Sequence, residues 1–307
     1  MVEVPVLYIT FCRPEYARLS FDAIKRAQPR KLYFYSNKAR EDRPDEVRRN
    51  EEVRAFVKEI DWDCEVVTWF RDEYVDIYTS LWGAMDWLFS NEEKGIVLEE
   101  DCVASEAFFT YCEKMLEFYK DDKRVSIISG NNRTPEYNPS GKRVFLTTHV
   151  DIYGWANWAN RWKSNDWEMK QWPIDFKKVR LYFGDFLPAY RIYRGWKRLH
   201  SSIKTYRPWD RISAYNRAKN NTYGLIPATN LVEDIGKYGV HHKNSINESE
   251  KIEVHLPLEN IYESFIGEEL VLDRYYEHKN FVARTHKEFR YIIKNLPRKM
   301  REILFRK

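Results

Sequence analysis

The sequence lacks a long apolar segment and is poor in glycine and proline. No apolar run among its 307 residues approaches eighteen residues, which excludes a membrane-spanning helix. Glycine and proline together number 23, too few for a collagen-like or low-complexity chain. The composition, 43% hydrophobic and 32% charged, is typical of a globular protein. A chain of this length can bury a sizeable core without disulfide support.

Cysteine is also scarce. The four cysteines form no Cys-x-x-Cys pair, and their spacing matches no zinc site: Cys12, Cys64, Cys102 and Cys112. Met1 is followed directly by Val-Glu-Val-Pro-Val, without the basic stretch and cleavage site of a secretory signal. We therefore expect free thiols and a cytoplasmic location.

Positive charge is concentrated at the C-terminal end. The net charge of the chain is +4, but residues 281–307 contain nine Lys or Arg against two Glu, which leaves the rest net acidic. Nucleic-acid binding across the body is therefore not expected. Residues 287–307 combine apolar positions at helical spacing with basic ones. This pattern suits a helix on an anionic membrane surface, at the inner face of the cell membrane, and equally a helix packed on the body.

The first half of the chain alternates strand and helix patterns. Short apolar runs predict strands at residues 4–11, 31–35, 65–70, 95–98 and 125–128. Helical periodicity predicts helices at residues 15–27, 44–60 and 77–89, and after an N-cap at Ser105. Four successive β–α units predict a Rossmann-like α/β fold, a mostly parallel sheet with helices on both faces. In such sheets ligands bind beyond the carboxyl ends of the strands.

The second half is less regular. The patterns predict extended segments at residues 143–150 and 223–232, and a short helix at 155–162. Residues 163–187 read as a loop, and two further helices are expected at 190–203 and 208–218. No Gly/Ser linker separates the halves, so we expect a single body.

The strongest local signal is the acidic run Glu99-Glu100-Asp101, directly after the apolar strand at 95–98. Carboxylates gathered at a strand end repel one another unless a cation compensates them. Mg²⁺ or Mn²⁺ suits one or two such carboxylates together with substrate phosphates. An exposed acidic turn that caps the next helix explains the run equally well.

Neither a GxGxxG nor a GxxxxGK[ST] run is present. The phosphates of a bound nucleotide would therefore rest on a metal ion and on basic side chains at strand ends, for which Arg13 and Arg71 are candidates. Asp210 opens a predicted helix, where the helix dipole alone favours an acidic residue. Trp155 and Trp158 would share one face of the short predicted helix, either as core or as a platform for a sugar.

Several ordered blocks carry a resemblance to a known family. They include PVLYITFCRPEYARLSFDAI, IDWDCEVVTWFRDE, WLFSNEEKGIVLEEDC, DIYGWANWANRW and YRPWDRISAYNRAKNNTYGLIPATNLVEDIG. Together they resemble the nucleotide-diphospho-sugar transferases of the glycosyltransferase-A fold. The similarity is strongest to bacterial relatives of N-acetylglucosaminyltransferase I, some of which are described as hemolytic-protein-like. It extends over roughly residues 4–245.

The resemblance implies a role for each candidate residue. The predicted roles are donor contact for Arg13, Asn37, Arg71, Glu99 and Glu100, metal ligation for Asp101 and His242, general base for Asp210, and acceptor contact for Trp155, Trp158 and Trp209. The nucleotide base would lie against Asn37. The implied cofactor is a divalent cation, Mn²⁺ or Mg²⁺.

The resemblance also implies an activity and a division of the chain. Residues 1–132 would bind a nucleotide-sugar, residues 133–250 would form the acceptor and catalytic half of the same body, and residues 251–307 would add basic amphipathic helices. The expected activity is an inverting, metal-dependent sugar transfer to a hydroxyl of a glycan or glycolipid acceptor in cell-surface polysaccharide biosynthesis. A sugar-phosphate nucleotidyltransferase and a non-catalytic glycan-binding module are the alternatives. The first usually needs a Gly-rich loop that is missing here, and the second is left open by Asn37-Lys38 and Tyr74-Val75-Asp76, which depart from the family pattern.

Overall fold

A computed structural model describes residues 1–139, 141–236 and 260–295, with side chains described as far as residue 285. Its strands are β1 (Val6–Thr10), β2 (Lys31–Ser36), β3 (Glu65–Phe70), β4 (Lys94–Glu99), β5 (Cys102–Ala104), β6 (Val125–Ser129), β7 (Val144–Thr147), β8 (Trp155–Trp158), β9 (Tyr223–Pro227) and β10 (Val232–Asp234). Its helices are α1 (Pro14–Ala27), α2 (Pro44–Ala55), α3 (Ile77–Asn91), α4 (Glu106–Phe118), α5 (Ala159–Lys163), α6 (Phe176–Phe183), α7 (Phe186–Ser202), α8 (Trp209–Asn220) and α9 (Arg274–Asn295), with short 3-10 turns at Phe56–Glu59 and Pro135–Tyr137.

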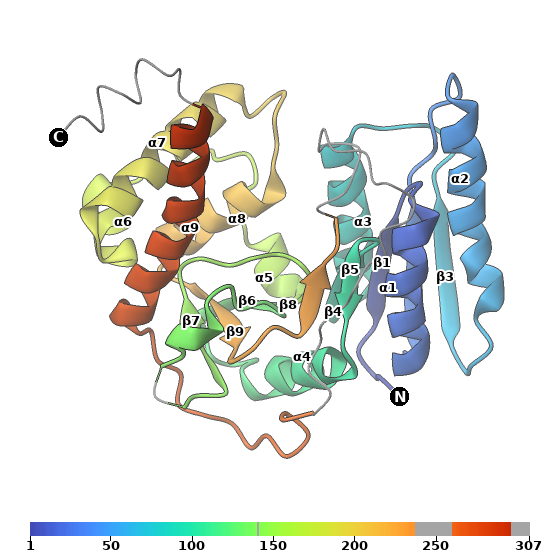
Figure 1. Ribbon diagram of the computed structural model, residues 1–307, viewed down its shortest axis with the longest axis horizontal. Helices are drawn as coiled ribbons and strands as arrows, with labels where there is room; N and C mark the ends of the chain where they lie inside the picture. The colour runs from blue at the N-terminus through green and yellow to red at the C-terminus, as the bar shows by residue number, and fades with distance from the viewer. Residues whose placement is uncertain (140, 237–259, 296–307) are drawn as a thin grey trace.

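Eight of the strands form one sheet in the order β3-β2-β1-β4-β8-β6-β9-β7 (Figure 1). β3, β2, β1 and β4 pair in parallel, as do β6 and β9. β8 runs antiparallel to both of its neighbours, and β7 closes the far edge antiparallel to β9. β5 and β10 make a separate antiparallel pair beside the end of β4. The predicted Rossmann-like, mostly parallel α/β fold is confirmed.

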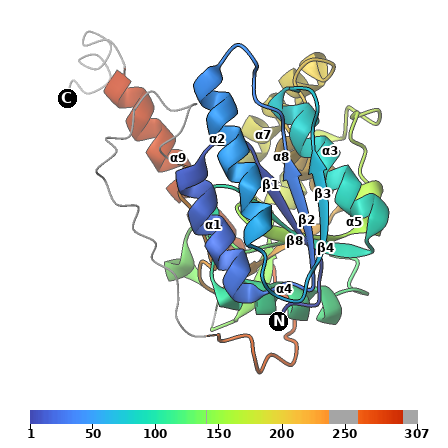
Figure 2. The same ribbon diagram turned by 90° about the vertical axis from the view of Figure 1, so that its right-hand side faces the viewer.

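Helices cover both faces of the sheet, as predicted. The side chains of α1, α2 and α4 pack in one hydrophobic core with alternate residues of β1, β2 and β4. Those of α3 and α5 pack on the opposite face with the intervening strand residues, among them Leu7, Ile9 and Val97. Figure 2 shows α1 and α2 together on one side of the strands and α3 on the other. The period-two alternation of each strand assigns its residues to one core or the other.

Two local predictions in the second half were wrong. The segment expected as one helix at 155–162 is strand β8 followed by α5, because β8 fills the gap between β4 and β6 and pairs with both. The hydrogen-bonding needs of two neighbouring strands outweigh a weak helical pattern. The segment expected as a loop at 163–187 contains α6, whose N-cap Asp175 accepts a hydrogen bond from the backbone N–H of Lys177 at 2.8 Å.

The C-terminal prediction is only partly covered. α9 includes the first part of the basic segment 287–307, while the rest lies outside the described residues, as do His241 and His242. Among the described helices, none is both long enough and apolar enough to cross a lipid bilayer.

Candidate functional site

Arg13 links the ends of β1 and β4. Three residues separate β1 from α1, and Arg13 is the last of them, in the N-cap position. Its Nε donates to Glu100 Oε1 at 2.6 Å, and its Nη2 donates to Asp101 Oδ2 at 2.9 Å. The second oxygen of Glu100 accepts the backbone N–H of Phe11 at 2.7 Å. Glu100 is therefore buried with both oxygens engaged, and it fixes the connection between β1 and α1.

The other two carboxylates of the acidic run are less fully compensated. Burial, and after it the charge of Asp101, raise the pKa of Glu99 to about 8, with Glu100 and Asp234 adding to the rise and Arg13 opposing it. Asp234 comes to this place because β10 pairs with β5, where it lies opposite Cys102. The electrostatic strain that the sequence predicted for this strand end is therefore present.

Asp101 is the carboxylate of the run best placed for a ligand. Its side chain is 19% exposed, and its Oδ2 lies against Gly236, where an added Cβ would stand only 2.2 Å away. A side chain at position 236 would displace Asp101, so glycine keeps this carboxylate in place. Sequence reasoning missed the contribution of Gly236, because the contact joins residues 135 positions apart.

The donor set fits a hard divalent ion, because carboxylate oxygens are the ligands that Mg²⁺ and Mn²⁺ prefer. Within the part of the chain that the structure describes, no three His, Cys, Asp or Glu side chains are grouped to hold a metal. An ion at Asp101 would therefore take its other ligands from diphosphate oxygens and water, the usual arrangement for Mg²⁺. His242, the other predicted ligand, lies outside the described residues.

Asn37 is buried at the end of β2 and connects two loops. Its Nδ2 donates to the Val75 carbonyl at 2.8 Å, and its Oδ1 accepts the backbone N–H groups of Lys38 at 3.0 Å and Val75 at 3.3 Å. The amide thus holds the loop after β3 against the loop after β2. Asn37 shapes the place where a nucleotide base is expected. Its side-chain amide groups, which would otherwise hydrogen-bond to a base, are occupied by these contacts.

Two residues of α2 organise the same strand ends and were not recognised from the sequence. The buried Asn50 Nδ2 donates to the carbonyls of Phe11 at 2.5 Å and Asn37 at 3.0 Å. Arg54 Nη2 donates to the carbonyls of Asn37 at 3.1 Å and Arg71 at 3.0 Å. Within the α2 pattern these polar residues read as solvent-facing. The only signal available was their alignment, four positions apart, on one face of the helix.

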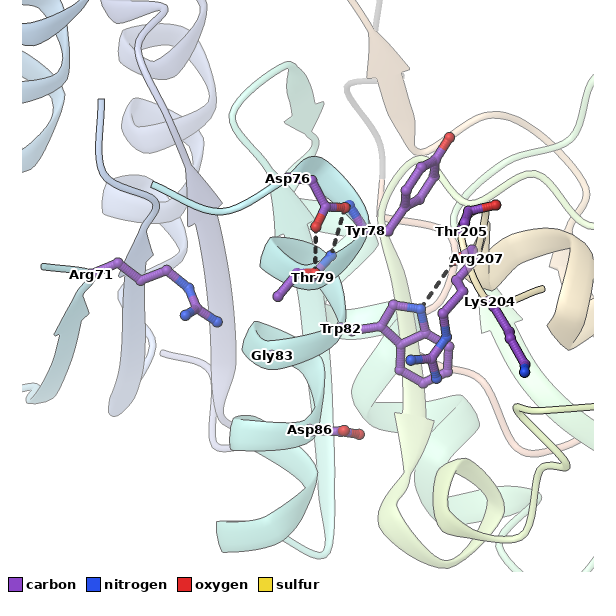
Figure 3. A pocket seen from close by; sticks show the side chains of 10 residues that line it. All are labelled: Arg71, Asp76, Tyr78, Thr79, Trp82, Gly83, Asp86, Lys204, Thr205 and Arg207. Carbon is purple, nitrogen blue, oxygen red and sulfur yellow. Dashed lines mark hydrogen bonds between the residues drawn. The ribbon is translucent and has the colours of Figure 1, made fainter. Parts of the chain in front are cut away.

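Arg71 lies at the end of β3 and extends toward α3 (Figure 3). Its Nε donates to the Tyr35 hydroxyl at 2.5 Å, and its guanidinium lies 4.6 Å from the centre of the Trp69 ring. Gly83 of α3 leaves room for it, since a Cβ there would come within 2.5 Å of Arg71 Nη2. The position of Arg71 is thus set by aromatic stacking and by one glycine.

Asp210 occupies the first turn of α8, as expected, and is half-buried. Burial raises the pKa of its carboxyl above the ordinary value, while hydrogen bonding and charge from Arg211 partly offset the rise. A carboxylate whose pKa is raised by a partly dry environment is a better proton acceptor than one in water. The direction of this shift suits the predicted general base, and that role stays a prediction.

The three predicted acceptor tryptophans are core residues. Trp155, Trp158 and Trp209 are at most 7% exposed. Because residues 155–158 form a strand, Trp155 and Trp158 point to opposite faces of the sheet, which corrects the prediction that they share one face. Trp155 stacks near Trp209, with ring centres 4.9 Å apart, and Trp158 donates its Nε1 to the Leu116 carbonyl at 3.1 Å. In this structure none of the three offers a ring face to a sugar.

Comparison with known proteins leaves the family of this chain open. No protein-family model matches the sequence, and no curated protein matches it. Among solved structures, the chain is similar to 4-diphosphocytidyl-2C-methyl-D-erythritol synthase from Anaerococcus prevotii, with 9% identity and a TM-score of 0.37 over 73% of this chain and 86% of that one.

Two further structures show a weaker similarity. HddC from Yersinia pseudotuberculosis has 9% identity and a TM-score of 0.32, over 57% of this chain and 81% of its own. A putative glucose-1-phosphate thymidylyltransferase from Bacillus anthracis, in complex with a sucrose, has 10% identity and a TM-score of 0.32, over 62% and 77%. Similarity at this level assigns no activity, so the function is argued from the site.

Proposed function

We propose that this protein is a metal-dependent glycosyltransferase that moves a sugar, with inversion, from a nucleotide-diphosphate donor to a hydroxyl of a glycan or glycolipid. We place it on the cytoplasmic side, in cell-surface polysaccharide biosynthesis. The observation that carries the proposal is the cluster at the carboxyl end of β4, where Arg13 and Asp101 meet beside Glu99. A guanidinium and a partly exposed carboxylate at this edge suit a diphosphate and its counter-ion.

The residues of the site have complementary roles in this proposal. Arg13 binds diphosphate oxygens, and Asp101 holds the divalent ion, which when bound stabilises negative charge on the departing nucleotide. Asp210 accepts the proton of the attacking hydroxyl. Inversion requires this base on the face of the sugar opposite the leaving group, and Asp210 comes from a different part of the chain than Arg13 and Asp101.

One observation weighs against a nucleotidyltransferase. Only Phe11, Cys12 and Arg13 connect β1 to α1. Such a short connection, itself bonded to Glu100, has no room for a Gly-rich loop that cradles phosphates. The phosphates of a ligand must therefore rely on Arg13 and the ion.

The test is a thermal-shift panel of UDP-, GDP-, dTDP- and CMP-sugars with Mn²⁺, followed by a transfer and hydrolysis assay with the stabilising donor. We expect one nucleotide class to stabilise the protein by several degrees. Asp101→Ala should lose that stabilisation together with its dependence on Mn²⁺. If no nucleotide-sugar stabilises the wild-type protein, the proposal fails.

Asp210→Asn separates catalysis from binding. Turnover should fall by about 100- to 10,000-fold, because the base is removed, while the donor-induced shift stays unchanged. Asp175→Asn is the matched control, since Asp175 also stands at the start of a helix, and an asparagine preserves its N-cap. Wild-type turnover in Asp210→Asn would exclude Asp210 as the base.

A further inference from the structure

A cavity of about 420 Å³ lies between α3 and the connection from α7 to α8 (Figure 3). It is lined from three sides: by Arg71 after β3, by one face of α3 together with its N-cap Asp76, and by Lys204, Thr205 and Arg207 in the connection. We call it the α3 cavity. None of the residue roles proposed above uses the α3 cavity, although Arg71, described above, lines it.

The walls of the α3 cavity are held together by two contacts. The rings of Tyr78 and Tyr206 meet edge to face with their centres 5.3 Å apart. Trp82 Nε1 donates to the Arg207 carbonyl at 3.1 Å, the contact drawn in Figure 3. The connection is thereby fixed against the first two turns of α3, so the cavity is formed before a ligand arrives.

The cations of the cavity are available to an anion. Arg71, Lys204 and Arg207 form no ion pair with any residue in the described ranges; Arg71 bonds the Tyr35 hydroxyl, and Arg207 lies over the Trp82 ring. The two carboxylates of the lining form no ion pair with these cations in the described ranges, and they accept hydrogen bonds from neutral groups instead. Asp76 caps α3 by accepting the backbone N–H groups of Tyr78 and Thr79, and Asp86 accepts Trp162 Nε1 at 2.6 Å.

The α3 cavity adjoins the proposed general base. Arg207 is three residues before Asp210, and Pro208 and Trp209 between them are buried. Burial raises the pKa of the Tyr78 hydroxyl, and smaller effects of Tyr206, Arg211 and Asp210 place these groups near it. Asp210 itself does not line the cavity, but Tyr78, which does, lies near it.

We propose that the α3 cavity binds a phosphate ester carried by the acceptor, through Arg71, Lys204 and Arg207. The identification of the ligand as the acceptor rests on the proposed transferase function, whereas phosphate binding by the cavity does not. Lys204 and Arg207 on the connection, and Arg71 on the far side of Trp82, provide donors for phosphate oxygens along the lining, and Trp82 supplies an apolar wall for the group that bears the phosphate.

Calorimetry with the full-length protein tests the assignment, using glucose 1-phosphate, dihexanoyl phosphatidic acid and, as the neutral reference, glucose. Both phosphate esters should bind and glucose should not. The tighter of the two identifies the source of the phosphate as a sugar phosphate or a lipid headgroup. Arg207→Gln should weaken phosphate binding about tenfold, and Lys204→Gln should weaken it too, because each removes a charge-assisted hydrogen bond. The control is Lys123→Gln, an exposed cation outside the cavity, just before β6.

Gly83→Ala is a second, independent test. Its methyl group would push the Arg71 guanidinium out of place, so this variant should also weaken phosphate binding. The assignment is overturned if neither ester binds the wild-type protein, or if Arg207→Gln binds it as tightly as Lys123→Gln does. Failure of the transferase proposal would look different. In that case no nucleotide-sugar would stabilise the protein, while phosphate binding would still depend on Arg207.

A second inference rests on the outer surface of α6 and α7. Residues 177–198 contain seven Lys or Arg and one Asp. The same stretch exposes four large apolar side chains: Leu181 is 66% exposed, Phe186 57%, Leu187 55% and Tyr190 43%. Apolar exposure interspersed with basic residues on one surface is typical of contact with a lipid interface.

On α7 the apolar and basic side chains form one stripe. Phe186 and Tyr190 are one turn apart and stacked, with ring centres 5.8 Å apart, and the guanidinium of Arg194 lies 5.7 Å from the Tyr190 ring centre. The opposite side of the helix, with Trp196 and Leu199, is buried in the core. The stripe therefore lies on the exposed side of the helix, where Phe186 also meets Phe176 of α6 edge to face, with ring centres 5.9 Å apart.

We infer that this stripe, defined by Phe186, Leu187, Tyr190, Arg194 and Lys197, docks on an anionic membrane. Its aromatic side chains suit the headgroup region, and its basic residues match the charge of anionic lipids. Pelleting with phosphatidylcholine vesicles, with and without phosphatidylglycerol, should show binding that requires the anionic lipid and falls with added salt.

The double variant Phe186→Gln with Leu187→Gln should lose most of this binding, and Lys197→Gln should weaken it about fivefold. Ile266→Gln is the matched control, because Ile266 is 82% exposed but lies outside the stripe. Deletion of residues 287–307 separates the stripe from the tail. Binding that disappears with the tail and is unchanged in the double variant would overturn the inference, as would equal pelleting with neutral vesicles.

Discussion

Replacing Arg13 by alanine tests the center of the proposed site through stability. Arg13 is the cation bonded to both Glu100 and Asp101, and the Glu100 side chain is only 5% exposed. Burial disfavours the charge of Arg13, but the two carboxylates outweigh it and raise the Arg13 pKa above its ordinary value. Removing Arg13 therefore leaves a buried carboxylate without its counter-charge.

The expected cost is about 3 kcal/mol, the low end of the range for breaking a buried ion pair, because Arg13 itself is 22% exposed. For a chain of this size such a loss lowers the melting temperature by roughly 5 °C. The assay is thermal unfolding at neutral pH without divalent ions. Glu100→Gln alone should cost less, because Arg13 still pairs with Asp101 and the amide oxygen of glutamine can accept one of the two hydrogen bonds, from Arg13 or from the Phe11 N–H.

The double variant Arg13→Ala with Glu100→Gln should recover part of the loss, since the more deeply buried of the two unpaired carboxylates is then neutral. Arg30→Ala is the control, because Arg30 pairs with Glu3 at the surface and its loss should change little. A melting temperature of Arg13→Ala within about 1 °C of the Arg30→Ala value would refute the reasoning. So would a double variant that is no more stable than Arg13→Ala.

Three further predictions concern the surroundings of the site. Asn50→Ala should cost about 2 kcal/mol in urea unfolding and weaken donor binding, because the Phe11 and Asn37 carbonyls lose a buried donor; unchanged donor affinity would contradict its positioning role. Burial holds the pKa of His149 down, to about 3, so the protein should lose stability as pH falls from about 6.5 toward 3, and His149→Phe should flatten this loss in melting curves. Because the pKa of Glu99 is about 8, the free energy of unfolding should fall as pH rises from about 4.5 to 8. In metal-free buffer, Glu99→Gln should therefore become more stable relative to the wild type over that range. A stability difference between the two proteins that stays constant with pH would show that Glu99 is already ionised at low pH.

Local sequence patterns predicted the parallel half of the sheet well. The run at 65–70 corresponds residue for residue to β3, and Ser105 caps α4 as expected, its Oγ accepting the Phe108 N–H at 3.2 Å. These features are set by neighbouring residues: hydrophobic period, cap chemistry and strand length. The acidic run was recognised for the same reason, since it directly follows a buried strand.

Features that depend on distant pairings could not be predicted. Whether residues 155–158 form a helix or a strand is decided by the open edges of β4 and β6, which no local pattern reveals. The contact of Gly236 with Asp101 and the bonds from Asn50 and Arg54 to the strand ends likewise join distant segments. The sequence left the tryptophans open between a sugar platform and a core, because aromatic residues suit both and only burial distinguishes the two.

The reversed strand β8 links the proposed base to the strand that leads to the acidic run. By pairing with β4, it places Trp155 opposite Val97, near the carboxyl end of the strand that leads to Asp101. Trp155 in turn packs on Trp209, the first residue of α8, and Asp210 follows directly. The position of the proposed base is therefore set by a sheet pairing and an aromatic contact, both of which tie it to the strand that ends at the proposed metal ligand.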